Sequence, residues 1–145
     1  MSQTVNGTAA HDRSTPSGGR VLLAEDNVAN QRVAALMLER LGCRVDIVAN
    51  GLEAIEAVSR VPYDLVLMDC QMPELDGFAA TEVIRRREAP DEHVVIIAMT
   101  AGVMPGDQER CITAGMDDYL PKPVTFSRLG ATIKRWLHQP VVRRQ

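Results

Sequence analysis

Hydrophobic residues along the chain gather into short runs that are separated by longer amphipathic stretches. Strand-like runs lie at residues 21–24, 43–48, 65–68 and 94–99, with a short fifth run at 119–120. Three of these runs, the first, third and fourth, contain no polar residue. Because the inner strands of a parallel sheet are buried on both faces, such uninterrupted runs are typical of a parallel sheet.

The stretches between these runs carry apolar residues at helical spacing. The predicted core positions of three helices are, in chain order, Val33, Leu36, Met37 and Leu41; Leu52, Ile55 and Val58; and Phe126, Leu129, Ile133 and Leu137. Gly42 and Pro140 are typical of the residues that follow a helix end. Two further helices are expected to start near Asp76 and near Pro105.

This alternation of strands and helices predicts an α/β fold, an open sandwich in which helices cover both faces of a five-stranded parallel sheet through right-handed crossovers. A chain of 145 residues has room for one such domain with its own core. We expect that domain at residues 20–139. Residues 1–19 are poor in apolar side chains and predict a flexible tail or a linker, and residues 140–145 predict a short C-terminal tail.

Composition narrows the classes of function. The formal net charge of −3 gives no electrostatic reason to bind nucleic acid. Three cysteines, Cys43, Cys70 and Cys111, lack the spacing of a zinc site or a disulfide framework, so we expect reduced thiols packed in the core. No signal peptide and no apolar stretch of about 20 residues is present, which favours a cytoplasmic chain without membrane contact.

Polar residues whose side chains could take part in catalysis or ligand binding lie at the ends of the predicted strands. Glu25 and Asp26 follow the first strand, Asp69 ends the third, and Thr100 and Lys122 follow the fourth and the fifth. In an open parallel sheet the ligand site lies outside the carboxyl ends of the strands, so these side chains are expected to share one site.

The three carboxylates of this site would repel one another. Two such charges about 4 Å apart cost on the order of 4 kcal/mol at an effective dielectric constant near 20, so a proton or a divalent cation must relieve the site. All the available ligands are oxygens, which indicates Mg²⁺, with Mn²⁺ as the alternative, rather than zinc. Together with Lys122 and the dication, the site would be nearly neutral and ready to receive a phosphoryl group. Asp69 is the expected nucleophile, which would form an aspartyl phosphate whose oxygens meet Lys122 and Thr100.

Four segments carry a family resemblance. In chain order, "VLLAEDN", "DLVLMDCQMPELDGF", "VVIIAMTA" and "AGMDDYLPKPV" resemble the receiver domain of two-component response regulators and hybrid histidine kinases. The similarity runs from about Arg20 to His138. It implies a flavodoxin-like (βα)5 sandwich with strand order 2-1-3-4-5, and it implies a histidine kinase or a histidine phosphotransfer domain as phosphodonor and a downstream protein as partner.

The same resemblance implies a role for each motif residue. Glu25 and Asp26 would hold the metal, Asp26 more directly, together with Asp69 and the backbone carbonyl of Gln71. Asp69 would be the phosphoacceptor, and Lys122 would contact the phosphoryl group and precede a cis peptide bond to Pro123. Thr100 and Tyr119 would form a switch that changes the surface made by the fourth helix, the fifth strand and the fifth helix.

Part of this pattern also fits other functions. A haloacid-dehalogenase-type phosphatase also uses a strand-end aspartate with Mg²⁺, but it needs a second acid where this chain has Gln71. A receiver that docks a partner without phosphorylation stays open, as does the choice between a stand-alone regulator and part of a hybrid kinase. None of the histidines at positions 11, 93 and 138 resembles a phosphodonor, so we expect an autocatalytic acceptor rather than an enzyme.

Two groups of residues receive ordinary structural interpretations. Four methionines are expected to fill gaps in a core that is poor in aromatic residues: Met68, Met72, Met99 and Met116. Arg85, Arg86 and Arg87 are expected to form a solvated helix end, where positive charge suits the helix dipole.

Overall fold

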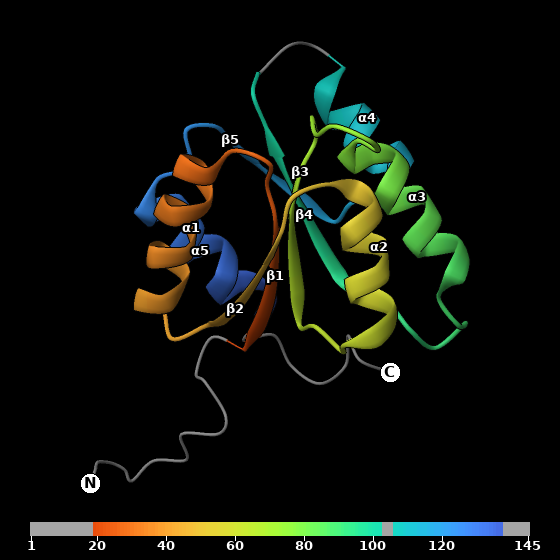
Figure 1. Ribbon diagram of the computed structural model, residues 1–145, viewed down its shortest axis with the longest axis horizontal. Helices are drawn as coiled ribbons and strands as arrows, with labels where there is room; N and C mark the ends of the chain where they lie inside the picture. Colours follow the sequence, from red (N-terminus) through yellow and green to blue (C-terminus); the bar gives the residue numbers. More distant parts are fainter. Residues whose placement is uncertain (1–18, 103–105, 138–145) are drawn as a thin grey trace, which may run out of the picture.

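The computed structural model describes residues 19–102 and 106–137 (Figure 1). Its elements in chain order are β1 (Arg20–Ala24), α1 (Val28–Arg40), β2 (Arg44–Val48), α2 (Gly51–Arg60), β3 (Leu65–Asp69), α3 (Gly77–Arg87), β4 (Val95–Thr100), α4 (Asp107–Ala114), β5 (Asp118–Pro121) and α5 (Phe126–Leu137). The predicted tails, except for Gly19, and the helix start near Pro105 lie outside the described residues.

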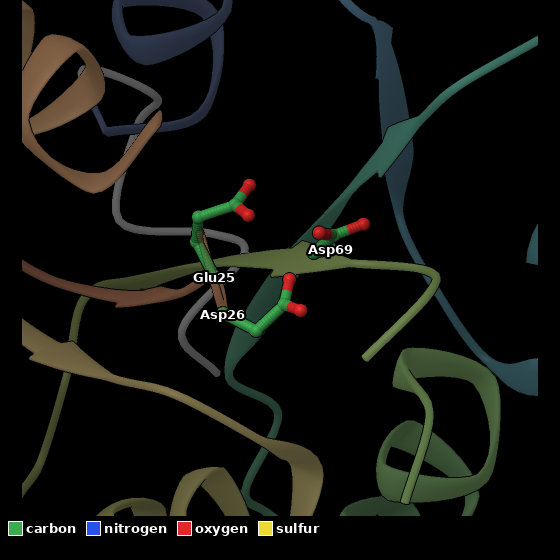
Figure 2. A group of neighbouring side chains, drawn as sticks. All are labelled: Glu25, Asp26 and Asp69. Atoms are coloured by element: carbon green, nitrogen blue, oxygen red, sulfur yellow. The ribbon is translucent and has the colours of Figure 1, made fainter. Parts of the chain in front are cut away.

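The five strands form one parallel sheet in the order β2-β1-β3-β4-β5, which confirms the predicted fold class and strand order. Helices α1 and α5 cover one face of this sheet, and α2, α3 and α4 cover the other (Figure 1). Strands β1 and β3 pair directly, with Ala24 opposite Met68. Their carboxyl ends, where Glu25, Asp26 and Asp69 lie, therefore come together (Figure 2).

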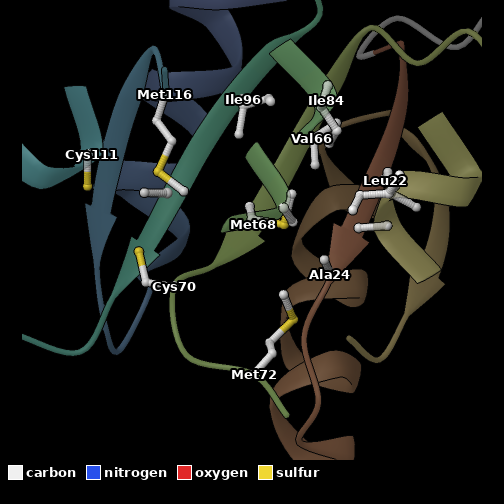
Figure 3. Packing of buried hydrophobic residues seen from close by; sticks show 14 residues of the cluster. Leu22, Ala24, Val66, Met68, Cys70, Met72, Ile84, Ile96, Cys111 and Met116 are labelled. Atoms are coloured by element: carbon white, nitrogen blue, oxygen red, sulfur yellow. The ribbon is translucent and has the colours of Figure 1, made fainter. Parts of the chain in front are cut away.

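Successive residues of the inner strands point into two different hydrophobic cores. On β3, Val66 and Met68 join the core under α2, α3 and α4, whereas Leu65 and Leu67 join the core under α1 and α5. This alternation follows from the two-residue period of a strand, and it explains why the runs at 21–24, 65–68 and 94–99 contain no polar residue. Figure 3 shows the first core, to which five sulfur-containing residues at positions 68, 70, 72, 111 and 116 contribute.

The sulfur-containing side chains take the places expected for them. The four methionines assigned to the core are buried. All three cysteines are buried, and none of them forms a disulfide bond, as predicted. Burial raises the pKa of the Cys43 thiol to about 11, and it also raises the pKa values of Cys70 and Cys111. Thiols in such surroundings are packing residues rather than nucleophiles.

The predicted apolar stripe of α1 is wrong for two residues. Val33 and Leu36 are 53% and 62% exposed, and the residues that enter the core are Ala34 and Leu38. Apolar residues occupy two faces of this helix, and the prediction gave too little weight to the small Ala34, which lets α1 lie close to the sheet. Leu52 and Phe126, which begin the other two predicted stripes, are exposed as well.

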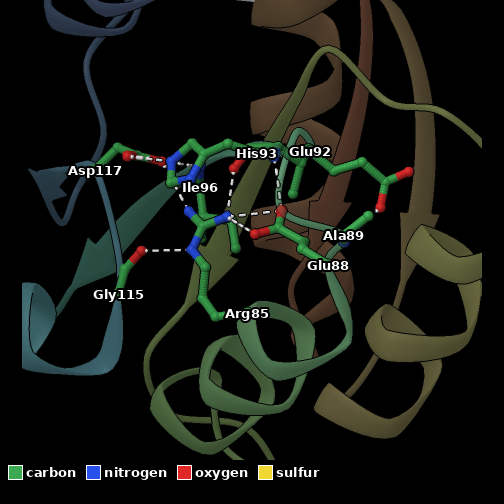
Figure 4. Close-up of polar contacts among 9 residues, drawn as sticks. Arg85, Glu88, Ala89, Glu92, His93, Ile96, Gly115 and Asp117 are labelled. Carbon is green, nitrogen blue, oxygen red and sulfur yellow. Dashed lines mark hydrogen bonds and ion pairs between the residues drawn. The ribbon is translucent and has the colours of Figure 1, made fainter. Parts of the chain in front are cut away.

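The interpretation of Arg85 as a solvated residue is also wrong. Its side chain is only 16% exposed and lies between the end of α3, the start of β4 and the turn before β5 (Figure 4). The guanidinium group donates to the carbonyls of Gly115 and Val94, both at 2.8 Å, and pairs with Glu88 and Asp117 at 2.9 Å. The fold brings these partners together from residues far apart in sequence, so helix periodicity gives no sign of them.

Candidate phosphoryl and metal site

The site lies at the carboxyl end of the sheet, and its five side chains come from the ends of four strands. The chain leaves β1 at Glu25 and Asp26, and Asp69, Thr100 and Lys122 lie at the ends of β3, β4 and β5. Parallel pairing with direct β1–β3 contact brings the first three together. The structure therefore gathers the acidic residues that the sequence placed at strand ends.

The three carboxylates form a compact acidic cluster (Figure 2). One oxygen from each of Glu25, Asp26 and Asp69 lies within 4.8 Å of the others. Glu25 and Asp69 are only 2% and 3% exposed, whereas Asp26 faces solvent. Only oxygen ligands, two of them buried and one exposed, fit a hard divalent cation such as Mg²⁺ that keeps part of its water.

Lys122 is the cation that balances this cluster. Its Nζ lies 2.8 Å from Asp69 Oδ2 and 3.1 Å from Glu25 Oε1. Burial acts to lower the pKa of Lys122, but the hydrogen bonds and charges of Asp69 and Glu25 outweigh that effect and raise it. The ammonium group is therefore charged at neutral pH. The peptide bond from Lys122 to Pro123 is cis, as the family resemblance implied.

Backbone groups fix the orientation of the two buried carboxylates. Glu25 Oε2 accepts from the Asn27 backbone N–H at 3.0 Å, and Asp69 Oδ1 accepts from the Gln71 backbone N–H at 3.1 Å. The side chain of Gln31 donates to the Glu25 carbonyl at 2.6 Å. The two carboxylates are thus held in place by short local bonds. A metal-ligand role for the Gln71 carbonyl stays a prediction.

Gly77, the first residue of α3, allows that helix to begin directly against Asp69. Its N–H donates to the Cys70 carbonyl at 3.1 Å, and a Cβ at this position would lie 2.2 Å from the Asp69 carbonyl oxygen. Any side chain here would push the helix away from the site. The sequence predicts a helix start near Asp76, but the spacing of residues along the chain gives no sign that Gly77 approaches Asp69 so closely.

The predicted switch residues lie on the α4 side of the site. Thr100 is buried, and its hydroxyl donates to the Gly102 carbonyl at 3.2 Å, within its own loop. Tyr119 is half-buried on β5, and its hydroxyl accepts a hydrogen bond from the side chain of Gln108 on α4. Both residues therefore contact the segment that links β4 to α4, or the helix itself.

Comparisons with known proteins agree with this geometry. Residues 21–134 match the family model described as the response regulator receiver domain. The hybrid signal transduction protein dokA of Dictyostelium discoideum is 43% identical over 81% of this chain. The chain spans only 7% of that relative's length, so it is similar to one part of a much larger protein.

Two solved structures resemble the whole described domain. The receiver domain of the sensor histidine kinase PA1611 from Pseudomonas aeruginosa has a magnesium ion coordinated in its active site cleft. It is 46% identical, with a TM-score of 0.77, and the match covers 85% of this chain and 100% of that one.

The second structure is the receiver domain of the Saccharomyces cerevisiae response regulator Ssk1, solved in complex with the histidine phosphotransfer protein Ypd1. It is 31% identical, with a TM-score of 0.74, over 81% of this chain and 87% of that one. Within the described ranges, none of the helices is both long and apolar enough to cross a membrane. The fold, the strand-end cluster and the family match together place this chain in the response regulator receiver domain family.

Proposed function

We propose that this receiver domain accepts a phosphoryl group from a phosphohistidine onto Asp69 and passes the signal on through a change in its own surface. The observation that carries the proposal is the environment of Asp69. Its buried carboxylate bonds to Lys122 at 2.8 Å and lies within 4.8 Å of two further acidic side chains. A nucleophile, a fixed cation and a cation-binding cluster thus occupy one strand-end site.

In the proposed transfer, a carboxylate oxygen of Asp69 attacks phosphorus. The bond between phosphorus and the donor's histidine nitrogen breaks as the new O–P bond forms, and the imidazole keeps the electron pair and then takes up a proton from water. The positive charge of Lys122 balances the negative charge that the phosphoryl oxygens bring to the site. The Gln71 N–H and Lys122 orient the Asp69 carboxylate before attack.

Glu25, Asp26 and Asp69 would hold Mg²⁺, with the Gln71 backbone carbonyl as a further ligand. When bound, the ion neutralises charge on the transferred group. The fit rests on the oxygen-only ligand set and on the exposed side of the cluster, which leaves room for water. The magnesium ion in the PA1611 receiver domain supports the same assignment.

The surface beside the site supports a protein phosphodonor. Val33 and Leu36 of α1 are exposed, and so is Phe126 at the start of α5. A hollow of about 410 Å³ between α1 and the segment after β5 is lined by Val33, Met37 and Val124 together with Lys122. An apolar surface of a phosphohistidine-bearing domain would cover these residues and bring its histidine to Asp69. The Ypd1–Ssk1 complex and the histidine kinases among the relatives support a donor of this kind.

The output is proposed to run through Thr100 and Tyr119. A phosphoryl group on Asp69 adds roughly −1.5 to −2 charges by analogy with other phosphorylated side chains, and it offers new hydrogen-bond acceptors. The Thr100 hydroxyl would leave the Gly102 carbonyl for this group, and Tyr119 would follow into the vacated space. The face formed by α4, β5 and α5 then changes for a downstream protein partner.

The decisive test is phosphoryl transfer to the Asp69→Asn variant from a labelled phosphohistidine protein. We expect the variant to stay folded and to take up no label, because the amide keeps the shape of the carboxylate without its nucleophilic oxygen. Asp91→Asn, which changes an exposed residue outside the site, is the matched control and should be labelled like the unmodified chain. Label on Asp69→Asn at full stoichiometry would refute the assignment, and an unlabelled native chain would favour a receiver that only docks its partner.

A further inference from the structure

Gly51, the first residue of α2, makes a close backbone contact with the segment that joins β3 to α3. Its N–H donates to the Leu75 carbonyl at 3.0 Å. A Cβ at Gly51 would lie 2.3 Å from that carbonyl oxygen and 2.9 Å from its carbon. Both atoms belong to the backbone, so a side chain at position 51 can fit only if the segment itself moves. Position 51 therefore requires glycine, because the Leu75 backbone leaves no room for a side chain.

The segment in contact with Gly51 carries a proposed metal ligand and has a strained conformation. It runs from Cys70 to Asp76 and contains Gln71, whose N–H bonds to Asp69 Oδ1. Glu74 has a φ of 69°, a left-handed conformation that non-glycine residues rarely adopt. Such a conformation persists only where neighbouring contacts impose it.

Two backbone contacts hold this segment from opposite ends. Gly77 bonds to Cys70 at the Asp69 end, and Gly51 bonds to Leu75 at the other. Leu75 is partly buried against the core under α2, so its carbonyl is fixed relative to the sheet through α2. A shift at Leu75 would therefore be transmitted along five residues to Gln71 and to the hydrogen bond on Asp69.

We propose that Gly51 is a positioning residue for the metal and phosphoryl site. The absence of a side chain lets α2 support the segment 70–76 at Leu75, and the segment in turn holds the Gln71 backbone against Asp69. This inference rests on the proposed function, because it assumes that the acidic cluster binds Mg²⁺. It adds α2, which contributes no ligand, to the elements that determine the affinity for the ion.

The test is Mg²⁺ binding by calorimetry to the full chain carrying Gly51→Ala. We expect affinity about tenfold weaker, the lower end of what is lost when a residue that orients a metal ligand is changed. Gly130→Ala is the matched control, since a Cβ there would meet Leu41 Cδ2 at an ordinary 3.5 Å. Ile133→Val, in the other core, controls for loss of stability alone. Both controls should bind Mg²⁺ like the native chain.

Native affinity in Gly51→Ala would overturn the inference, whereas a native chain without Mg²⁺ affinity would overturn the proposed function instead. A second measurement needs no variant. Saturating Mg²⁺ should slow amide exchange at Gly51, because ordering of the segment tightens its bond to Leu75. The Ala54 amide, which bonds to the Asn50 carbonyl at 3.1 Å, reports on the same helix and should not change. Equal exchange at Gly51 with and without the ion would contradict the proposal.

Discussion

Charge balance at single residues decides how the site can work. Lys122 bonds to carboxylate oxygens of Glu25 and Asp69, two of the residues that would bind Mg²⁺. The ammonium group and the ion therefore attract the same oxygens and repel each other. Lys122 should favour a phosphorylated Asp69, since it then faces phosphoryl oxygens, and it should disfavour Mg²⁺ binding before phosphorylation.

Replacing Lys122 by Gln separates these two effects. We expect Mg²⁺ to bind about tenfold more tightly, because the substitution removes a positive charge that weakens ion binding by about 1.4 kcal/mol. Phosphorylation of Asp69 should slow about 100-fold, as is typical when one group that stabilises developing charge is lost. Lys134→Gln, on the exposed face of α5, is the control. Calorimetry and labelling kinetics would measure both effects, and weaker Mg²⁺ binding would show that Lys122 mainly holds the carboxylates in place.

The strand-end positions of the site residues could be predicted from the sequence because they lie at the ends of apolar runs that can be recognised. Glu25, Asp26, Asp69 and Lys122 meet once the strands are parallel and in the right order. The contacts of Gly51 and Gly77 could not be predicted, because they depend on how closely a helix approaches a backbone. A glycine pattern alone does not distinguish such a contact from an ordinary helix start.

At the scale of elements, the Arg85 network joins three parts of the chain near the amino ends of β4 and β5 (Figure 4), whereas the acidic cluster lies at the carboxyl end of the sheet. Arg85 comes from α3, and Asp117 from the turn between α4 and β5. Asp117 also accepts from the Ile96 N–H at 2.8 Å and contacts His93 Nε2 at 2.7 Å. Removing one partner of such a partly buried set leaves the other charges uncompensated.

Arg85→Met should therefore lower the free energy of unfolding by about 3 kcal/mol, the lower end of the range for breaking a buried pair. The neighbouring Arg86→Met is the control, because Arg86 is exposed at the same helix end, and it should change stability by less than about 0.5 kcal/mol. Urea unfolding followed by circular dichroism measures both. Equal stability of the two variants would mean that the network adds nothing to the fold.

Helix α1 shows how far pattern alone can place an element. A helix is present where the apolar spacing from Val33 to Leu41 predicted one, but Val33 and Leu36 were assigned to the core and are exposed. An amphipathic pattern cannot distinguish an apolar helix face that packs on the sheet from one that is exposed on the surface. The strands were easier to place because burial on both faces leaves no such choice.

At the scale of the whole molecule, α4 is held differently at its two ends. Its C-terminal end is fixed because Arg85 bonds to the Gly115 carbonyl, and Gly115 caps the helix. Its N-terminal end follows the loop that begins after Thr100, and Gln108 in its first turn bonds to Tyr119. We therefore propose that a change at the phosphoryl site reaches α4 through its N-terminal end.

Amide exchange with and without the phosphoryl mimic beryllofluoride tests this path. We expect changed protection in the first turn of α4, from Asp107 to Arg110, and at Tyr119, with little change at Gly115 because Arg85 fixes that end. Thr100→Ala should still bind beryllofluoride, since its hydroxyl is no metal ligand, but the changes in α4 and at Tyr119 should disappear. Ser59→Ala, which removes an exposed hydroxyl on α2, is the control and should behave like the native chain. Protection confined to the ends of β1 and β3 in the native protein would mean that the site binds the mimic without switching the surface.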